Sequence, residues 1–147
     1  MAVAPGAWSQ ADEVLPQIKG RITDQGGLIS SSQKHLMYQV LAQHESGSHH
    51  HVVLLTAKGA GAELPQVYAK RIWQAWQRKD KSRSVLFVLF KQQKVAAIIA
   101  GSELSKKLDV ISINAMIDNE ISTPLKAGDF DGAALAGVKG IVGALGH

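Results

Sequence analysis

Three carboxylates are the residues of this chain best suited to bind a cation. Asp24 and Glu103 follow stretches with the pattern of strands, and Asp109 comes shortly after Glu103, so we expect the three to gather at one edge of a sheet. Ca²⁺ and Mg²⁺ bind several oxygen ligands of this kind, and such a cation would polarise a phosphoryl group and activate water. The alternative, which we favour, is structural: Asp24 and Asp109 cap turns or helix starts, and Glu103 faces solvent.

A group of histidines invites a zinc interpretation that the pattern does not support. His49, His50 and His51 are consecutive, and adjacent strand residues point to opposite faces, so they cannot all bind one ion from a regular strand. The chain has no cysteine, and no acidic residue stands at a spacing that would complete the site. We therefore expect these residues and His44 to lie on the surface near a strand start, and His35 to be exposed on a helix.

Other catalytic motifs are missing from the sequence. Gly59-Ala60-Gly61 lacks the lysine of a P-loop and the pattern of a dinucleotide-binding turn. Ser30-Ser31-Ser32 has no histidine at a spacing typical of a nucleophilic triad. The net charge of +4 is modest and no aromatic residues follow a basic stripe, which argues against nucleic acid and fits attraction to an anionic membrane surface.

Neither a membrane span nor a signal peptide is predicted. No stretch reaches the ~20 apolar residues that a span requires. The nearest candidate, Phe130 to Gly146, is interrupted by Lys139, and Met1 to Lys19 lacks a basic start followed by an apolar run. With Pro5, Gly6 and Pro16 and little periodicity, residues 1–19 are expected to form a loosely ordered arm before a domain at 20–147.

The remaining pattern alternates strands with helices. Apolar, β-branched runs predict strands that are buried on both faces, and periodic apolar residues predict helices between them. Only three residues separate the last two strands, so these form an antiparallel hairpin. The predicted segments are an extended piece at 21–28, strands at 51–56, 84–90 and 94–100, and helices at 31–45, from Pro65, from about 108 to before Pro124, and from Asp129 or Asp131 to about Leu145.

The last predicted helix has a stripe of small residues. Ala133, Gly137, Gly140 and Ala144 recur on one face. Glycine costs about 1 kcal/mol in a helix interior, so something must compensate. We favour close packing inside the domain over self-association through the stripe.

Three segments in the right order resemble the TPM domain family. Gly20 to Ser30 is similar to the family pattern G-x-V-x-D-x-x-G-x-L-S, and Pro124 to Gly132 is similar to a proline followed by F-K-x-G-D-Y-x-x-G. Between them, Val52 to Thr56, Tyr68-Ala69 and Trp76 match a strand and a helix of the family. The resemblance implies a three-layer αβα sandwich of the α/β class, Rossmann-like, with a small mixed sheet. It also implies an extracytoplasmic location beside a membrane and, in some members, divalent-metal and phosphatase activity.

The departures from the family pattern concern its acidic centre. Arg83-Ser84 stands where the family usually has an acidic or Asn residue and a Gly. Asp24, Glu103 and Asp109 remain, but the Arg83 cation would pair with a carboxylate, Asp24 or Glu103, and replace a metal, or else grip a substrate phosphate. We therefore expect a periplasmic or otherwise extracytoplasmic accessory module, tethered to the membrane in its precursor, that binds a protein partner near membrane proteins and binds Ca²⁺ or Mg²⁺ weakly. The alternative is a divalent-cation-dependent acid phosphatase.

Overall fold

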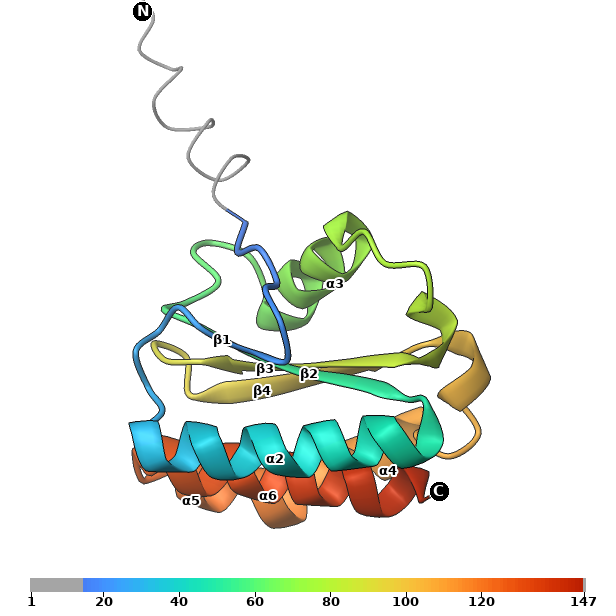
Figure 1. Ribbon diagram of the computed structural model, residues 1–147. Coiled ribbons are helices and arrows are strands. Elements are labelled where there is room, and N and C mark those ends of the chain that lie inside the picture. The colour runs from blue at the N-terminus through green and yellow to red at the C-terminus, as the bar shows by residue number, and fades with distance from the viewer. Residues whose placement is uncertain (1–14, 147) are drawn as a thin grey trace, which may run out of the picture.

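Apolar, β-branched sequences form a single four-stranded sheet at the centre of the domain. The computed structural model describes residues 15–146, and the sheet order is β1-β2-β3-β4 (Figure 1). β3 is buried along its whole length, as its run of apolar residues requires. The strands are β1 (Ile22–Asp24), β2 (His51–Ala57), β3 (Ser84–Phe90) and β4 (Val95–Ala100).

The sheet is mixed, as predicted. β1 pairs with β2 and β2 with β3 in parallel, while β3 and β4 form the expected antiparallel hairpin. Lys94 closes this hairpin with a φ of 53°, and its N–H donates to the Phe90 carbonyl at 3.0 Å. The carboxyl ends of β1, β2 and β3 therefore lie at one end of the sheet, and the end of β4 lies at the other.

Helices cover both faces of the sheet and complete three layers. α3 lies on one face, and the longer helices α2 and α6 lie on the other face with the shorter ones (Figure 1). The expected αβα sandwich is thus confirmed. The helices are α2 (Ser31–Ser48), α3 (Pro65–Ala75), α4 (Val110–Met116), the π-helical turn η3 (Ile117–Ile121), α5 (Ser122–Lys126) and α6 (Phe130–Leu145), with short 3₁₀ turns η1 (Lys81–Arg83) and η2 (Ser102–Leu104).

Capping residues set where the long helices begin and end. Ser30 is the N-cap of α2 and accepts a hydrogen bond from the Gln33 N–H at 3.4 Å. α2 ends at Ser48, beyond the predicted position 45, because His49 takes the left-handed conformation with φ 63°. Asp129 caps α6 by accepting from the Gly132 N–H at 2.9 Å.

The prediction that a helix stops before Pro124 was wrong. The helical path continues from α4 through η3 into α5, and Pro124 is the third residue of α5. The Ser122 N–H bonds to the Ile117 carbonyl, five residues back, because η3 is a π turn. Pro124 therefore lies in the first turn of a renewed α-helix, where its missing N–H has no intrahelical role.

The small-residue stripe of α6 serves packing inside the domain. A Cβ at Gly137 would lie 2.2 Å from the ring of Phe87, and a Cβ at Gly140 would lie 2.9 Å from the Met116 sulfur. Only glycine lets α6 approach β3 this closely. The expected close packing is confirmed at these two positions.

Two apolar layers hold the sandwich together. The larger lies between the sheet and α2, α4, α5 and α6, and the smaller lies under α3. Most of the predicted arm lies outside the described residues, but Leu15 and Ile18 pack against the smaller layer. Within residues 15–146, none of the helices combines the length and the hydropathy needed to cross a bilayer.

Candidate functional site

Asp24 ends β1 with a carboxylate that protein donors already occupy. The Thr56 hydroxyl donates to Oδ1, as does the Leu28 N–H at 2.9 Å. Oδ2 accepts from the Ile29 N–H at 3.2 Å and lies 3.1 Å from the Lys34 ammonium. Only 5% of the side chain is exposed. Asp24 therefore fixes the loop between β1 and α2.

The pKa of Asp24 follows from these contacts. Burial by itself raises the pKa of this carboxyl, but the hydrogen bonds from Thr56, Leu28 and Ile29 together with Lys34 outweigh it, so the pKa lies below its ordinary value. A cation would have to displace Lys34 and compete with the other donors for the same oxygens. The geometry supports the structural interpretation of Asp24.

Glu103 and Asp109 also have structural partners. Glu103 lies on η2, accepts from the Ser82 hydroxyl at 2.7 Å and lies 3.7 Å from the Arg83 guanidinium. Asp109 is the N-cap of α4 and accepts from the Ser112 N–H at 2.7 Å, which lowers its pKa. Both carboxylates are at the surface. Of the two partners considered for Arg83, the structure provides Glu103.

The expected gathering of the three carboxylates does not occur. Asp24 lies in the same row across the sheet as Ala96, whereas Glu103 comes after Ala100. That difference is roughly 13 Å along the strands, with three spacings of about 4.8 Å across the sheet. The reason is the hairpin, which reverses β4 and puts its end opposite the end of β1. Among residues 15–146, no three His, Cys, Asp or Glu side chains are grouped so that they could hold a metal ion.

The prediction of surface histidines was wrong for His44 and His50. These side chains are 3% and 7% exposed, and His44 Nε2 lies 3.3 Å from His50 Nδ1. The signal that could have revealed the burial of His44 is helical spacing, since Met37 and Leu41 lie on the same face of α2. His49 is exposed as the C-cap of α2, and His51 turns to different partners.

The surroundings of His50 disfavour its charged form. Burial lowers the pKa of His50, and the nearby Arg83 and Lys107 cations lower it further. The Ser48 hydroxyl donates to the His44 carbonyl at 2.6 Å and accepts from the His50 N–H at 3.1 Å. The pair thus anchors the turn between α2 and β2.

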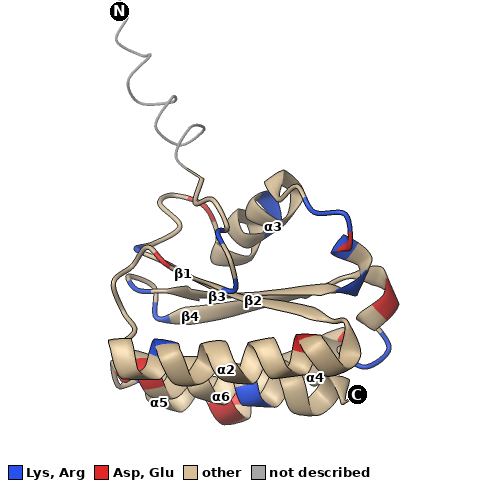
Figure 2. Cartoon of the chain, viewed as in Figure 1, with Lys and Arg blue, Asp and Glu red and all other residues tan. Residues whose placement is uncertain are grey.

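Basic and acidic side chains contact one another at the amino ends of the parallel strands. His51 lies 3.2 Å from both Glu45 and Asp80, and Glu45 lies 3.2 Å from Arg21. Burial alone would raise the pKa of Glu45, but His51 and Arg21 outweigh it and lower the pKa. The mixture of red and blue at this end is visible in Figure 2. The Arg21 guanidinium at this end is therefore already paired with Glu45.

A groove runs along β4, and we call it the β4 groove. It lies between α3 and the α4–α5 segment and has two adjoining hollows of about 330 and 450 Å³, both bordered by Gln66 and Asn114. Val67 and Val110 line it and are 46% and 72% exposed, and Leu64 at its end is 71% exposed. No sequence motif predicts the groove. The sequence indicates it only indirectly, because β4 is the last predicted strand and the helix that follows it has apolar residues.

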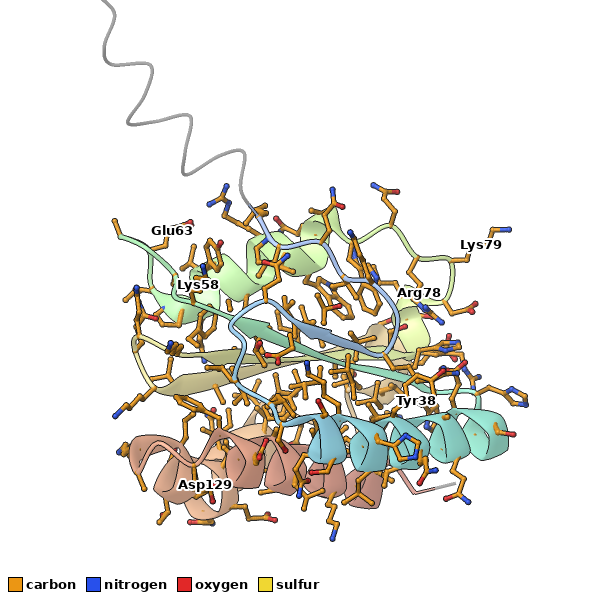
Figure 3. The ribbon with its side chains drawn as sticks, turned by 60° about the vertical axis from the view of Figure 1, so that its left-hand side comes forward. Tyr38, Lys58, Glu63, Arg78, Lys79 and Asp129 are labelled. Atoms are coloured by element: carbon orange, nitrogen blue, oxygen red, sulfur yellow. The ribbon has the colours of Figure 1, made fainter. Side chains whose placement is uncertain are left out.

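The first and the last of the three segments that resemble family motifs meet in space. The Ser30 N–H at the start of α2 donates to Asp131 Oδ1 in α6 at 2.9 Å. Asp129, labelled in Figure 3, begins α6 as its cap. The motif residues therefore join the first and last long helices of the domain.

Comparisons with known proteins agree with this architecture. The model of the TPM domain matches residues 22–144. The solution structure of the N-terminal domain of a protein from P. gingivalis superposes with a TM-score of 0.78 at 19% identity, over 84% of this chain and 80% of that one. The N-terminal domain of a Corynebacterium glutamicum protein gives 0.68 at 16% identity, over 91% and 85%. No match is found among curated proteins. The chain belongs to the TPM domain family.

Proposed function

We propose that this domain is a non-catalytic binding module of the bacterial envelope that acts beside membrane proteins. The observation that carries the proposal is the carboxylate of Asp24, whose oxygens accept three hydrogen bonds and lie against Lys34. Metal-assisted phosphoryl transfer requires a metal with open positions for substrate and water. An oxygen set that is filled by protein donors does not provide them.

The β4 groove supports the binding part of the proposal. Six large apolar side chains are exposed among the described residues, and Leu64, Val67 and Val110 all line this groove. Apolar side chains gathered beside a hollow are typical of a surface that a partner covers. At the amino ends of the parallel strands, the side chains of Arg21, Glu45, His51 and Asp80 contact one another instead.

The envelope location is supported by membership of the TPM domain family and by the modest positive charge of +4. A basic surface is attracted to anionic lipid headgroups over about a Debye length. The two solved structures named above are N-terminal domains of their proteins, as a module would be. Fractionation of cells of the source organism, followed by immunodetection, tests the location.

The proposal includes weak binding of Ca²⁺ or Mg²⁺, but only at Glu103 and Asp109. Glu103 and Asp109 are exposed and lie near a chain reversal, so each can bind a cation through one carboxylate at millimolar concentration. Asp24 is not expected to take part. This binding would carry no catalytic role.

A phosphatase assay separates the proposal from the acid phosphatase alternative. The domain is incubated with p-nitrophenyl phosphate at pH 5 and 7, with and without millimolar Mg²⁺ or Ca²⁺. We expect no turnover above the buffer rate. Turnover near ~1 s⁻¹, within the usual enzyme range, that depends on the cation and disappears in Arg83→Asn or Asp24→Asn would overturn the proposal.

A crosslinking experiment tests the binding function directly. A photo-crosslinking amino acid replaces Val110 in the β4 groove of the full-length protein, and a matched variant carries it at Gln39, which is exposed on α2. We expect a discrete crosslinked product with a membrane protein from position 110 and none from position 39. Equal products from both positions would refute a specific binding surface.

A further inference from the structure

The β4 groove has an open row of backbone groups as its floor. β4 pairs with β3 on one side, and no described strand lies on its other side. The Gly101 N–H donates to the Ser84 carbonyl at 2.8 Å, and bonded and non-bonded pairs alternate along an antiparallel ladder. The N–H and C=O groups of Ala96, Ile98 and Ala100 therefore point away from β3, and Ala96 and Ile98 line the groove.

The walls of the groove suit a strand rather than a helix. α3 and α4 flank the edge of β4, and the two hollows follow β4 from Lys94 to Ile99. Six residues of strand extend about 20 Å. Apolar walls at Val67 and Val110 would contact side chains that alternate on either face of an added strand.

The charge around the groove identifies the kind of strand. Lys70, Lys94 and Lys126 line it against a single acid, Asp118. No described ion pair occupies these lysines. The hairpin end continues with Lys58, and Figure 2 shows basic residues gathered where β3 turns into β4. A segment with acidic residues is complementary to this surface.

The same lysines argue against a second copy of this chain as the occupant. Pairing of two β4 edges would bring like charges together, and lysines on an edge strand are a known means of preventing such pairing. Acidic residues on a different chain remove this repulsion.

We propose that β4 binds an extended, acidic segment of a partner protein by strand addition, with apolar side chains of that segment held between α3 and α4. The segment hydrogen-bonds to Ala96, Ile98 and Ala100 and extends the sheet from four strands to five. This inference rests on the proposed binding function and names the chemical class of its partner.

The test uses a defined peptide and the ¹⁵N-labelled domain. The probe is a blocked peptide of alternating valine and threonine with glutamates at both ends, and binding is measured by amide shifts and calorimetry. We expect saturable shifts in residues 94–100 and slower hydrogen exchange at Ala96, Ile98 and Ala100. A peptide N-methylated at alternate residues should lose binding at least tenfold, since it cannot complete the ladder. Equal binding of both peptides, or shifts confined to α2, would overturn the inference.

Charge reversal provides the matched variants. Lys70→Glu with Lys126→Glu should weaken binding of the acidic peptide by roughly tenfold and strengthen binding of a lysine-ended peptide. Lys79→Glu with Lys139→Glu makes the same change in net charge at exposed positions away from the groove and should leave the acidic peptide's affinity within about twofold. Equal losses in both pairs would mean that the peptide senses only the net charge, and the inference would fail.

A backbone variant tests strand addition without changing charge. Ala96→Pro removes a donor that faces the groove and no ladder bond to β3, so the fold should persist and peptide binding should fall. Full affinity in a folded Ala96→Pro domain, or a concentration-dependent dimer through β4, would refute the inference. Cation-dependent turnover of a phosphate ester would instead overturn the proposed function and leave peptide binding as a separate result.

Discussion

Replacement of Asp24 by Asn distinguishes a structural carboxylate from a metal ligand. The variant keeps the size of the side chain but removes its charge and turns one acceptor oxygen into an NH₂ group. Oδ2 receives the Ile29 N–H and lies 3.1 Å from Lys34, whereas Oδ1 receives the Leu28 N–H and the Thr56 hydroxyl. Whichever oxygen becomes NH₂, a backbone donor then faces another donor.

The cost can be worked from these contacts. Hydrogen bonds to a charged group contribute about 1.5–3 kcal/mol each, and an unsatisfied buried donor costs about 1–3 kcal/mol. Because Asn retains one acceptor, we expect Asp24→Asn to lower the free energy of unfolding by roughly 2–4 kcal/mol. For a domain of this size that corresponds to a fall in Tm of roughly 5–15 °C.

The assay is urea unfolding followed by circular dichroism at pH 7, with Glu103→Gln as the matched control. Glu103 is 56% exposed, so its replacement should change stability by less than about 1 kcal/mol. Millimolar Ca²⁺ should not raise the Tm of the wild type more than that of the Asp24→Asn variant. An Asp24→Asn variant as stable as the wild type, together with a Ca²⁺-dependent rise in Tm found only in the wild type, would refute the structural interpretation.

The pH dependence of the same variant gives a second reading. The pKa of Asp24 lies below its ordinary value, so the folded state favours the carboxylate. Its contribution to stability is therefore present above the unfolded pKa of about 3.9 and is lost as the pH falls through the folded pKa. The difference in stability between wild type and Asp24→Asn should shrink over that acid range.

Three further predictions follow from the packing and the charges. Gly137→Ala should lower stability by about 1–3 kcal/mol because its Cβ meets a buried ring, whereas Gly143→Ala, with open space, should raise it by about 1 kcal/mol; equal effects in urea unfolding would contradict the packing of α6. Millimolar Ca²⁺ should shift the amide resonance of Glu103 and leave that of Asp24 unchanged, and the reverse pattern would restore the metal interpretation. The His50 ring should titrate below its ordinary pKa of about 6.5, so its contribution to stability is lost as the pH falls from about 6.5 through the folded pKa; an NMR midpoint above 6.5 would contradict its burial.

The sheet and most helix boundaries could be predicted because local sequence determines them. The apolar runs at 84–90 and 94–100 leave no choice but buried strands, and the three residues between them leave no room for a parallel crossover. Pro65 and Ser30 mark helix starts by their own backbone and side-chain chemistry. Pro124 misled the prediction because a π turn upstream had already shifted the hydrogen-bond pattern.

The candidate site could not be predicted to the same extent, because it depends on where strand ends lie in space. Asp24 and Glu103 both follow strands, and only the sense of each strand decides whether those ends meet. The predicted hairpin implies that the end of the last strand lies opposite the end of the first. It therefore argues against a site shared by Asp24 and Glu103. The buried pair of His44 and His50 brings together residues from a helix and the next strand start, and no local pattern encodes that contact.

The position of α6 at the end of the chain has a consequence for how the domain is made. The sheet is complete at Ala100, but the part of its face that α6 covers, at Phe87, stays exposed until Gly137 and its neighbours have been made. At a synthesis rate of ~5–20 residues per second, the remaining ~45 residues up to Leu145 take roughly 2–9 s. During that interval an early-folded sheet would expose an apolar face and a free strand edge, both prone to aggregation. Folding of this chain is therefore complete only when its last helix has been made.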